Sequence, residues 1–440
     1  MKMKMKIFSR VKAPKAIPRF SLKSALFLFL FLFTFFRSFA SWILIPMDEV
    51  QSNHLKSYGI AYWVLQNEIE VYWLLNYRGG SFMIKNNKTI EEECIIRDVS
   101  YEVIADARAN LILAEIANPE VNQESVKLEK VPKIAVYSPK GKLPWDDAVT
   151  LVMTYAEIPY EVIYDEDIIG GELPKYDWLH LHHEDFTGQY GKFYGRYRNA
   201  PWYQEQVRSM EDLAHSLGYD KVSKLKLDVV LTIREFVAGG GFLFTMCSGT
   251  DSYDIALAAH QTDICEAMFD GDPADPMAQS KLDFSMPFAF RDFHLEKNPL
   301  VYEFSDIDAT PIHTKIKQTQ DFFTLFEFSA KWDIVPTMLT QNHQQVLKSF
   351  MGQTTSFNKK FIKSDVLILG ETKAYNTARY IHGNFGMGHW TFYGGHDPED
   401  YQHFVGDPPT DLNLFPNSPG YRLILNNILF PAAKKKKQKT

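Results

Sequence analysis

The chain contains little cysteine. Its 440 residues hold three cysteines, Cys94, Cys247 and Cys265. So few cysteines exclude a disulfide-stabilised scaffold, and an odd number leaves at least one thiol unpaired within the chain. A bridge between Cys94 and Cys265 is conceivable, and it would leave Cys247 as the free thiol.

The start of the chain lacks negative charge and a long hydrophobic run. Residues 1–40 contain nine Lys or Arg and no Asp or Glu, and their apolar run from Ala25 to Phe36 is short for a bilayer span. Small residues then precede a predicted cleavage after Ala40. This pattern predicts a signal peptide and therefore a secreted or periplasmic protein. Retention of the segment as a membrane anchor is the alternative.

Positive charge is scarce in the rest of the chain. Cleavage would change the formal net charge from −7 to −16, because 38 basic residues would then face 54 acidic ones. Phosphate backbones repel so acidic a protein. We therefore expect no nucleic-acid partner and no stable membrane insertion after cleavage, and we interpret the lysine-rich tail over 432–440 as a solvated terminus.

About 400 residues after the predicted cleavage exceed the usual size of one hydrophobic core. The pattern predicts an N-terminal α/β lobe over 41–130, including a helix over 101–117. Over 131–431 short strands alternate with helices, which predicts a doubly wound parallel sheet. The stretch over about 271–352 is rich in aromatics and proline, and it predicts an inserted cap.

Cys247 lies where an apolar strand over 241–246 gives way to a helix predicted to begin near Asp251. Such a sharp turn holds a side chain out of the sheet and points free backbone N–H groups at whatever that side chain attacks. A helix N-terminus also favours the thiolate. The position therefore predicts a nucleophile, and the alternative is a small buried hydrophobe.

A second segment of interest, Gly394 to Glu399, follows the last predicted core strand. His396 could take the proton of a thiol, and a nearby carboxylate could fix the tautomer of its ring. Glu399 is the preferred orienting residue and Asp397 the second choice. The alternative is a loop histidine that caps a turn.

The cluster from His180 to Asp185 ends an earlier predicted strand. Alternation along the strand places His180 and His182 on one face, where they could bind a metal together with Glu184 or Asp185. A polar wall of a substrate site and a hydrogen-bonded structural cluster are the other two interpretations. No distant ligand completes a metal site in the sequence, so no metal and no other cofactor is assigned.

These segments resemble the class I glutamine amidotransferase-like superfamily. The shared patterns are the glycine-rich Gly239-Gly240-Gly241-Phe242-Leu243-Phe244 strand and the late segment from Gly386 to Asp397. They are most similar to those of divergent exported members, some of which are labelled asparagine synthetase B. The matching stretches, about 131–183, 228–260 and 364–431, cover roughly half of the chain after the predicted cleavage.

The resemblance implies a flavodoxin-like doubly wound parallel sheet and a Cys-His-Glu triad. Its nucleophile would be Cys247, its base His396 and its orienting residue Glu399. The N–H of Ser248 would supply half of an oxyanion hole, and the segment of His182, His183 and Glu184 would supply the second amide and the site wall. The sequence departs from the family pattern twice, since Glu399 follows His396 by three residues rather than two and the turn before Cys247 lacks a glycine.

The sequence therefore predicts a cysteine hydrolase or amidase that acts on a small amide or a glycan-linked substrate. The main alternative is a noncatalytic module of the same fold that binds a carbohydrate or peptide. A third is an ATP-dependent, asparagine-synthetase-like amide-forming enzyme, because Ser248 to Ser252 is similar to a shortened pyrophosphate-binding loop. The sequence indicates no oligomeric state.

Overall fold

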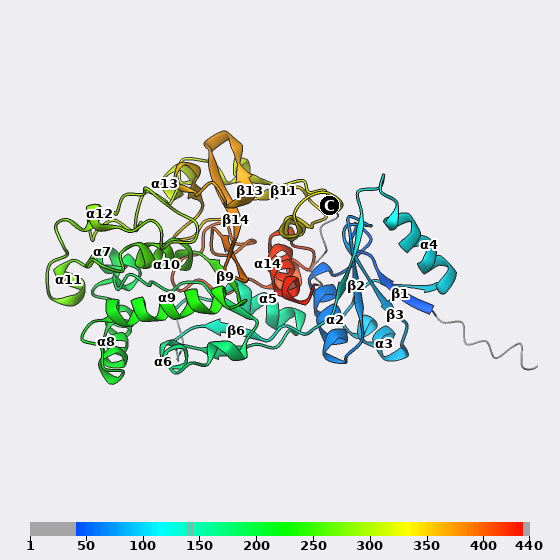
Figure 1. The fold of residues 1–440 in the computed structure, drawn as a ribbon, viewed down its shortest axis with the longest axis horizontal. Helices are drawn as coiled ribbons and strands as arrows, with labels where there is room; N and C mark the ends of the chain where they lie inside the picture. The colour runs from blue at the N-terminus through cyan, green and yellow to red at the C-terminus, as the bar shows by residue number, and fades with distance from the viewer. Residues whose placement is uncertain (1–40, 140, 142–143, 434–440) are drawn as a thin grey trace, which may run out of the picture. The chain divides into compact units, whose positions relative to one another are not determined.

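The computed structural model describes residues 41–139, 141 and 144–433. These described residues cluster as one compact unit. Two sheets organise the described residues, one of five strands and one of ten (Figure 1). The predicted signal peptide over 1–40 and most of the basic tail lie outside the described residues.

The smaller sheet is antiparallel throughout, with the strand order β4-β1-β3-β2-β5. Its strands are β1 (Ser41–Ile45), β2 (Val71–Leu75), β3 (Ser81–Lys85), β4 (Glu102–Ala105) and β5 (Glu124–Leu128). Three helices accompany it: α2 (His54–Gln66), α3 (Lys88–Ile96) and α4 (Asp106–Ala117). The helix predicted over 101–117 thus begins only at Asp106, because the residues before it pair with β1 as an edge strand.

Both faces of the smaller sheet are buried. Alternation along β1 turns Trp42 and Leu44 toward the apolar side of α4, and it turns Ile43 and Ile45 toward a core shared with α2. The same core continues beneath the larger sheet, where α2 packs against α5 (Ala148–Ala156) and α14 (Pro419–Leu429). The N-terminal region is therefore attached to the rest of the described chain by continuous apolar packing.

Five adjacent strands of the larger sheet are parallel, in the order β7-β6-β8-β9-β15. They are β6 (Ile134–Tyr137), β7 (Glu161–Ile163), β8 (Trp178–Leu181), β9 (Phe242–Met246) and β15 (Gly388–Tyr393). Phe242 and Phe244 of β9 face the core with α5 and α14, whereas Leu243 faces the opposite core with α9 (Val222–Ala238). Burial on both faces explains why the inner strands β6, β8 and β9 are mostly apolar, whereas the edge strand β7 has two exposed residues.

The predicted flavodoxin-like doubly wound parallel sheet is wrong, because the remaining strands are antiparallel. They are β10 (Phe322–Leu325), β11 (Val346–Lys348), β12 (Phe357–Asn358), β13 (Leu367–Thr372) and β14 (Thr377–Phe385). The connections from β13 to β14 and from β14 to β15 span only 373–376 and 386–387. Such short links allow hairpins but not the crossover that parallel neighbours need. The structure is a mixed α/β fold with two sheets.

The region predicted as an inserted cap, 271–352, contributes to the sheet. Strands β10 and β11 lie within it and form the edge of the ten-stranded sheet. Its other elements are short, such as α12 (Ala278–Lys281) and α13 (Thr310–His313). The region therefore combines two edge strands with loops that approach the ends of the parallel strands.

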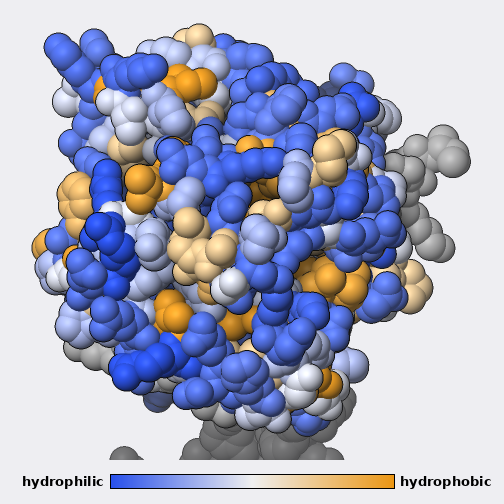
Figure 2. Space-filling model, turned by 90° about the vertical axis from the view of Figure 1, so that its left-hand side faces the viewer, coloured by the Kyte–Doolittle hydropathy of each residue, from blue (hydrophilic) through white to orange (hydrophobic). Residues whose placement is uncertain are grey.

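The described helices include none that is long and apolar enough to cross a membrane. The face of the molecule drawn in Figure 2 is mostly hydrophilic, and its apolar residues form small separate groups.

Candidate active site

Cys247 occupies the turn between β9 and α10 (Ser248–Ala258). It is the N-cap residue of the helix, with φ of 49° and ψ of −138°. A non-glycine residue with positive φ stores strain, which the surrounding structure must hold in place. Here the Cys247 N–H donates to Gly395 O at 3.2 Å and the Gly249 N–H donates to His182 O at 2.8 Å. The turn is thus held in place by the residues that directly follow the two neighbouring strands, β8 and β15.

Three parallel strands bring the distant histidines to this turn. Strand β9 lies between β8 and β15, so the residues after all three strands meet at one edge of the sheet. One donor atom from each of His182, His183, Cys247 and His396 lies within 4.8 Å of all the others. The His182 and His183 rings stack at 3.9 Å, and the His396 ring lies 4.8 Å from that of His183. The predicted nucleophile and base are therefore neighbours.

Asp146 stands where an orienting carboxylate is needed. It precedes α5, and its Oδ1 lies 3.7 Å from His396 Nε2 and 2.9 Å from His403 Nε2. Burial opposes the charge on Asp146, but its interactions with His396 and His403 hold its pKa well below the usual value. Burial likewise opposes the charge on His396, yet Asp146 and the Cys247 sulfur raise the His396 pKa to about 10. The imidazole beside the sulfur is thus a cation at neutral pH.

The other two histidines of the cluster are neutral. Burial lowers the pKa of His182 to about 4, although Asp147 opposes this shift, and burial lowers the pKa of His183 well below its usual value. Asp147 Oδ1 lies 3.3 Å from His182 Nδ1, and the backbone oxygen of Asp146 lies 2.6 Å from His183 Nε2. One protonated and two neutral imidazoles therefore surround Cys247.

The predicted Glu399 is not among the contacts of His396. Burial raises its pKa, and its nearest interactions are with Ser418, Lys348 and Asp397. Asp397 in turn accepts the Glu399 N–H at 2.9 Å. Neither carboxylate predicted to orient the ring belongs to the group around Cys247, because the loop after His396 turns them toward α14.

The predicted metal pair of His180 and His182 lies with Asp147, with one donor atom of each within 4.8 Å of the others, and not with the predicted Glu184 or Asp185. His180 contacts Asp147 Oδ2 at 3.2 Å and Phe244 O at 3.1 Å. Glu184 lies 4.0 Å from Lys226, with its pKa raised to about 7 by burial, and Asp185 accepts the Thr187 N–H at 2.7 Å. Glu184 is therefore part of a buried ion cluster rather than the wall of the site.

Two backbone N–H groups, those of Ser248 and Gln353, are candidates for stabilising charge at Cys247. The Ser248 N–H is the first amide of α10 and has no acceptor within the helix. The Gln353 N–H donates to Cys247 Sγ at 3.2 Å, and its side-chain amide holds the loop in place by donating to Gly191 O at 2.6 Å. Gly352 makes this approach possible, because a Cβ there would lie 2.7 Å from His396 N. Both amides can stabilise negative charge near the sulfur.

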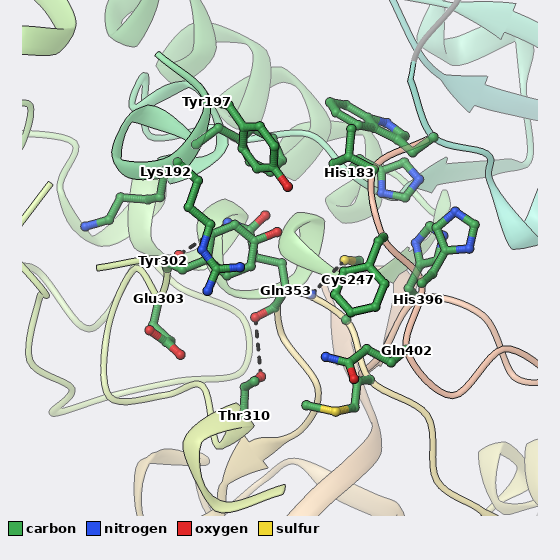
Figure 3. Close-up of a pocket in the computed structure, with 18 of the residues that line it drawn as sticks. His183, Lys192, Tyr197, Cys247, Tyr302, Glu303, Thr310, Gln353, His396 and Gln402 are labelled. Atoms are coloured by element: carbon green, nitrogen blue, oxygen red, sulfur yellow. Dashed lines mark hydrogen bonds between the residues drawn. The ribbon is translucent and has the colours of Figure 1, made fainter. Parts of the chain in front are cut away.

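A cavity of about 470 Å³ opens onto the thiol. In Figure 3, His183 and His396 lie on one side of Cys247, and Gln353 lies on the other. Aromatic side chains form much of the remaining wall, together with the cations Lys192 and Arg196 and the anion Glu303. These aromatic residues are Trp145, Phe193, Tyr197, Tyr302 and Phe404.

The three cysteines are unpaired in the structure. Burial raises the pKa of Cys94 to about 12 and that of Cys265 well above its ordinary value. Cys247 alone lines the cavity described above. The bridge considered between Cys94 and Cys265 is not formed.

Sequence reasoning missed Asp146, His403 and Gln353. Asp146 and Asp147 follow the first strand of the parallel set and precede a helix, so their position at the ligand-binding edge of the sheet was a usable signal. The Asp147 carboxylate caps α5 by accepting the N–H groups of Val149 and Thr150. Gln353 acts through its backbone and lies in an irregular loop, so no sequence pattern marks it.

No protein-family model matches the chain, and no curated protein matches it. Among solved structures, it is similar to two cytoplasmic proteins of Salmonella typhimurium, STM3548 (10% identity, TM-score 0.32) and STM1381 of strain LT2 (11% identity, TM-score 0.35). Each alignment covers 69% of this chain and 100% of the other. Gan42B, a GH42 β-galactosidase, matches at 12% identity and a TM-score of 0.26, over 61% of this chain and 28% of its own. At such low TM-scores, none of these proteins informs the function of this chain.

Proposed function

We propose that this chain is a cysteine hydrolase that cleaves a small amide or a glycan-linked amide. The observation that supports this most is the position of Cys247, at a strained strand-to-helix turn, beside a protonated His396 and at the wall of a cavity. A protonated imidazole and a helix N-terminus both favour the thiolate, which is the nucleophilic form of cysteine. The predicted export signal would place this activity outside the cytoplasm.

The proposed reaction has two halves. The Cys247 thiolate attacks the carbonyl carbon, a C–S bond forms, and the electron pair of the C=O bond moves to oxygen. His396 then gives its proton to the leaving nitrogen as the C–N bond breaks, which leaves a thioester on Cys247. Neutral His396 next takes a proton from water as the water oxygen attacks the thioester carbon; the C–O bond forms, the C–S bond breaks, and a carboxylic acid leaves the restored Cys247 thiolate beside protonated His396. Asp146 holds the ring in place and stabilises its cation.

The amides of Ser248 and Gln353 are the proposed stabilisers of the oxyanion. The Gln353 N–H donates to the sulfur, and the Ser248 N–H is the free amide at the start of the helix that Cys247 caps, so both are placed to meet a tetrahedral intermediate on Cys247. In this scheme Gln353 replaces the second donor that the resemblance places near His183. A cavity of about 470 Å³ is within the range of small-molecule sites.

Acyl-enzyme trapping tests this function. A p-nitrophenyl ester and a panel of small amides are offered to the full chain in the presence of EDTA, and the acylated peptide is identified by mass spectrometry. We expect the acyl group on Cys247 and a loss of turnover of at least about 1,000-fold in Cys247→Ala. Cys265→Ala is the matched control and should keep its activity. Acylation elsewhere, or full turnover in Cys247→Ala, overturns the proposal.

A further inference from the structure

We propose that His182, His183, Cys247 and His396 also form a binding site for one zinc-class transition-metal ion, as an alternative to the free thiol. The four residues come from the ends of three parallel strands, and no single segment of the sequence contains them all. The metal site itself does not depend on the proposed hydrolase chemistry.

The donor set suits such a metal. Three imidazoles and one thiolate are ligands that zinc and cobalt prefer. Their donor atoms all lie within 4.8 Å of one another. Ligand atoms of zinc lie about 2.0 to 2.3 Å from the ion, so a modest contraction of the four side chains would close the shell.

The surroundings of the rings match those of metal-bound histidines. One ring nitrogen of each histidine faces an oxygen of Asp146 or Asp147: His182 Nδ1 at 3.3 Å, His183 Nε2 at 2.6 Å and His396 Nε2 at 3.7 Å. A metal-bound histidine typically has such a partner at its other nitrogen, which fixes the ring and its tautomer. Moreover, His182 is 1% exposed, and neither of its ring nitrogens has a hydrogen-bond partner among the described residues, although Nδ1 lies near Asp147.

Four protein ligands would fill a tetrahedral shell and leave no open position. The sulfur electron pair would then be held by the metal, and Cys247 could not attack a carbonyl or an alkylating agent. Metal binding would therefore switch the thiol off reversibly. This consequence, unlike the site itself, rests on the proposed function.

Another cysteine-containing cluster provides the internal control. Cys265 lies with Asp263 and Asp270, but Lys221 Nζ already contacts these two carboxylates at 2.8 and 2.9 Å. A cation held there by the protein itself opposes a metal ion. Cobalt binding should accordingly depend on Cys247 and not on Cys265.

The test is a titration of the reduced, EDTA-treated full chain with Co²⁺, after removal of the EDTA. We expect one equivalent to produce the thiolate-to-cobalt charge-transfer band, and Zn²⁺ to abolish that band by displacement. Cys247→Ser should lose the band and Cys265→Ser should keep it. Asp147→Asn, which retains an oxygen to cap α5, should weaken Co²⁺ binding about 10- to 100-fold.

Each outcome decides between the two uses of the sulfur. A band that is absent from the wild type, or that survives in folded Cys247→Ser, overturns the metal site and leaves the hydrolase proposal standing. A Cys247-dependent band in a chain that is never acylated at Cys247 supports the metal site and overturns the hydrolase. Thermal melting of each variant shows whether it is folded.

Discussion

Two groups of histidines in this molecule are buried in contrasting surroundings. The cavity group consists of His182, His183, His396 and His403, whose neighbours are Cys247 and three carboxylates, those of Asp146, Asp147 and Asp400. The stacked pair consists of His54 and His343, with ring centroids 4.2 Å apart. His54 contacts Asn417 Oδ1 and Met47 O, both at 3.0 Å, and His343 lies 3.2 Å from the Arg422 guanidinium.

The difference shows that the partners of a histidine, rather than its burial, decide what it can do. In the stacked pair, burial and the nearby Arg422 charge lower the pKa of His54 to about 4 and that of His343 to about 3. In the cavity group, Asp146 and the sulfur raise the pKa of His396 to about 10. The stacked pair is therefore neutral at pH 7, whereas the cavity group contains the protonated imidazole that the proposed reaction needs.

The largest expected effect is a loss of protein stability when the surroundings of the stacked pair are changed. Arg422 is fully buried and donates to Tyr58 Oη, Met47 O and Gly79 O. Arg422→Met would leave these acceptors without their charged donor, so we expect a loss of about 3 kcal/mol or more in the free energy of unfolding. Urea denaturation measures it. The rate of Cys247 alkylation in the folded variant should change less than about twofold. A larger change would show that the two groups of histidines do not act independently.

The next effect is a pH dependence of stability that belongs to the stacked pair. The folded-state pKa of His343, about 3, lies below the ordinary 6.5, so the unfolded chain binds a proton first as the pH falls. Stability is therefore lost on acidification through this window, by about 2 kcal/mol between pH 7 and pH 5. His343→Gln should lack that part of the loss. Equal slopes for wild type and variant in urea denaturation would contradict the neutral, buried state of His343.

The smallest effect concerns the orienting carboxylate of the cavity group. Asp146→Asn removes the charge that favours the His396 cation, so we expect iodoacetamide to alkylate Cys247 about tenfold more slowly at pH 6.5, equivalent to about 1.4 kcal/mol. The pH profile of alkylation should shift upward as well, which a merely structural role would not cause.

Glu399→Gln is the matched control for this change. Glu399 interacts with Ser418 rather than with His396, so its neutral amide should alter the alkylation rate less than about twofold. A larger effect of Glu399→Gln than of Asp146→Asn would restore the triad that the family resemblance implies.

The parallel half of the larger sheet could be predicted from the sequence, because apolar strands such as 242–246 alternate with helices. The antiparallel half could not be predicted as easily. The segments over 367–372 and 377–385 each contain a predicted strand, and only their four-residue connection shows that they form a hairpin. Residues 102–105 were predicted as part of a helix from their local pattern. In the structure they form a strand, because pairing with β1 overrides that local preference.

Within the site, the positions of Cys247 and His396 followed from strand ends that meet at one edge of a sheet. The orienting residue did not, because Glu399 is adjacent in sequence whereas Asp146 is adjacent in space, 250 residues before His396. Its short distance from His396 in the sequence favoured Glu399, but the chain turns at Asp397 and Pro398, so that Glu399 does not contact His396. Gln353 N–H was inaccessible to any argument from residue type, since every residue except proline offers the same group.

The central claim is that a protonated His396 holds Cys247 as a reactive thiolate. The most direct measurement is the rate of Cys247 alkylation by iodoacetamide against pH, in EDTA, followed by mass spectrometry of the modified peptide. Because the imidazole of His396 and the N-terminus of α10 both lie at Cys247 and favour a thiolate in this account, we expect the rates at pH 6 and pH 8 to agree within about threefold. A fall of about a hundredfold over that range, as for a free cysteine with a pKa of about 8.5, would contradict the account.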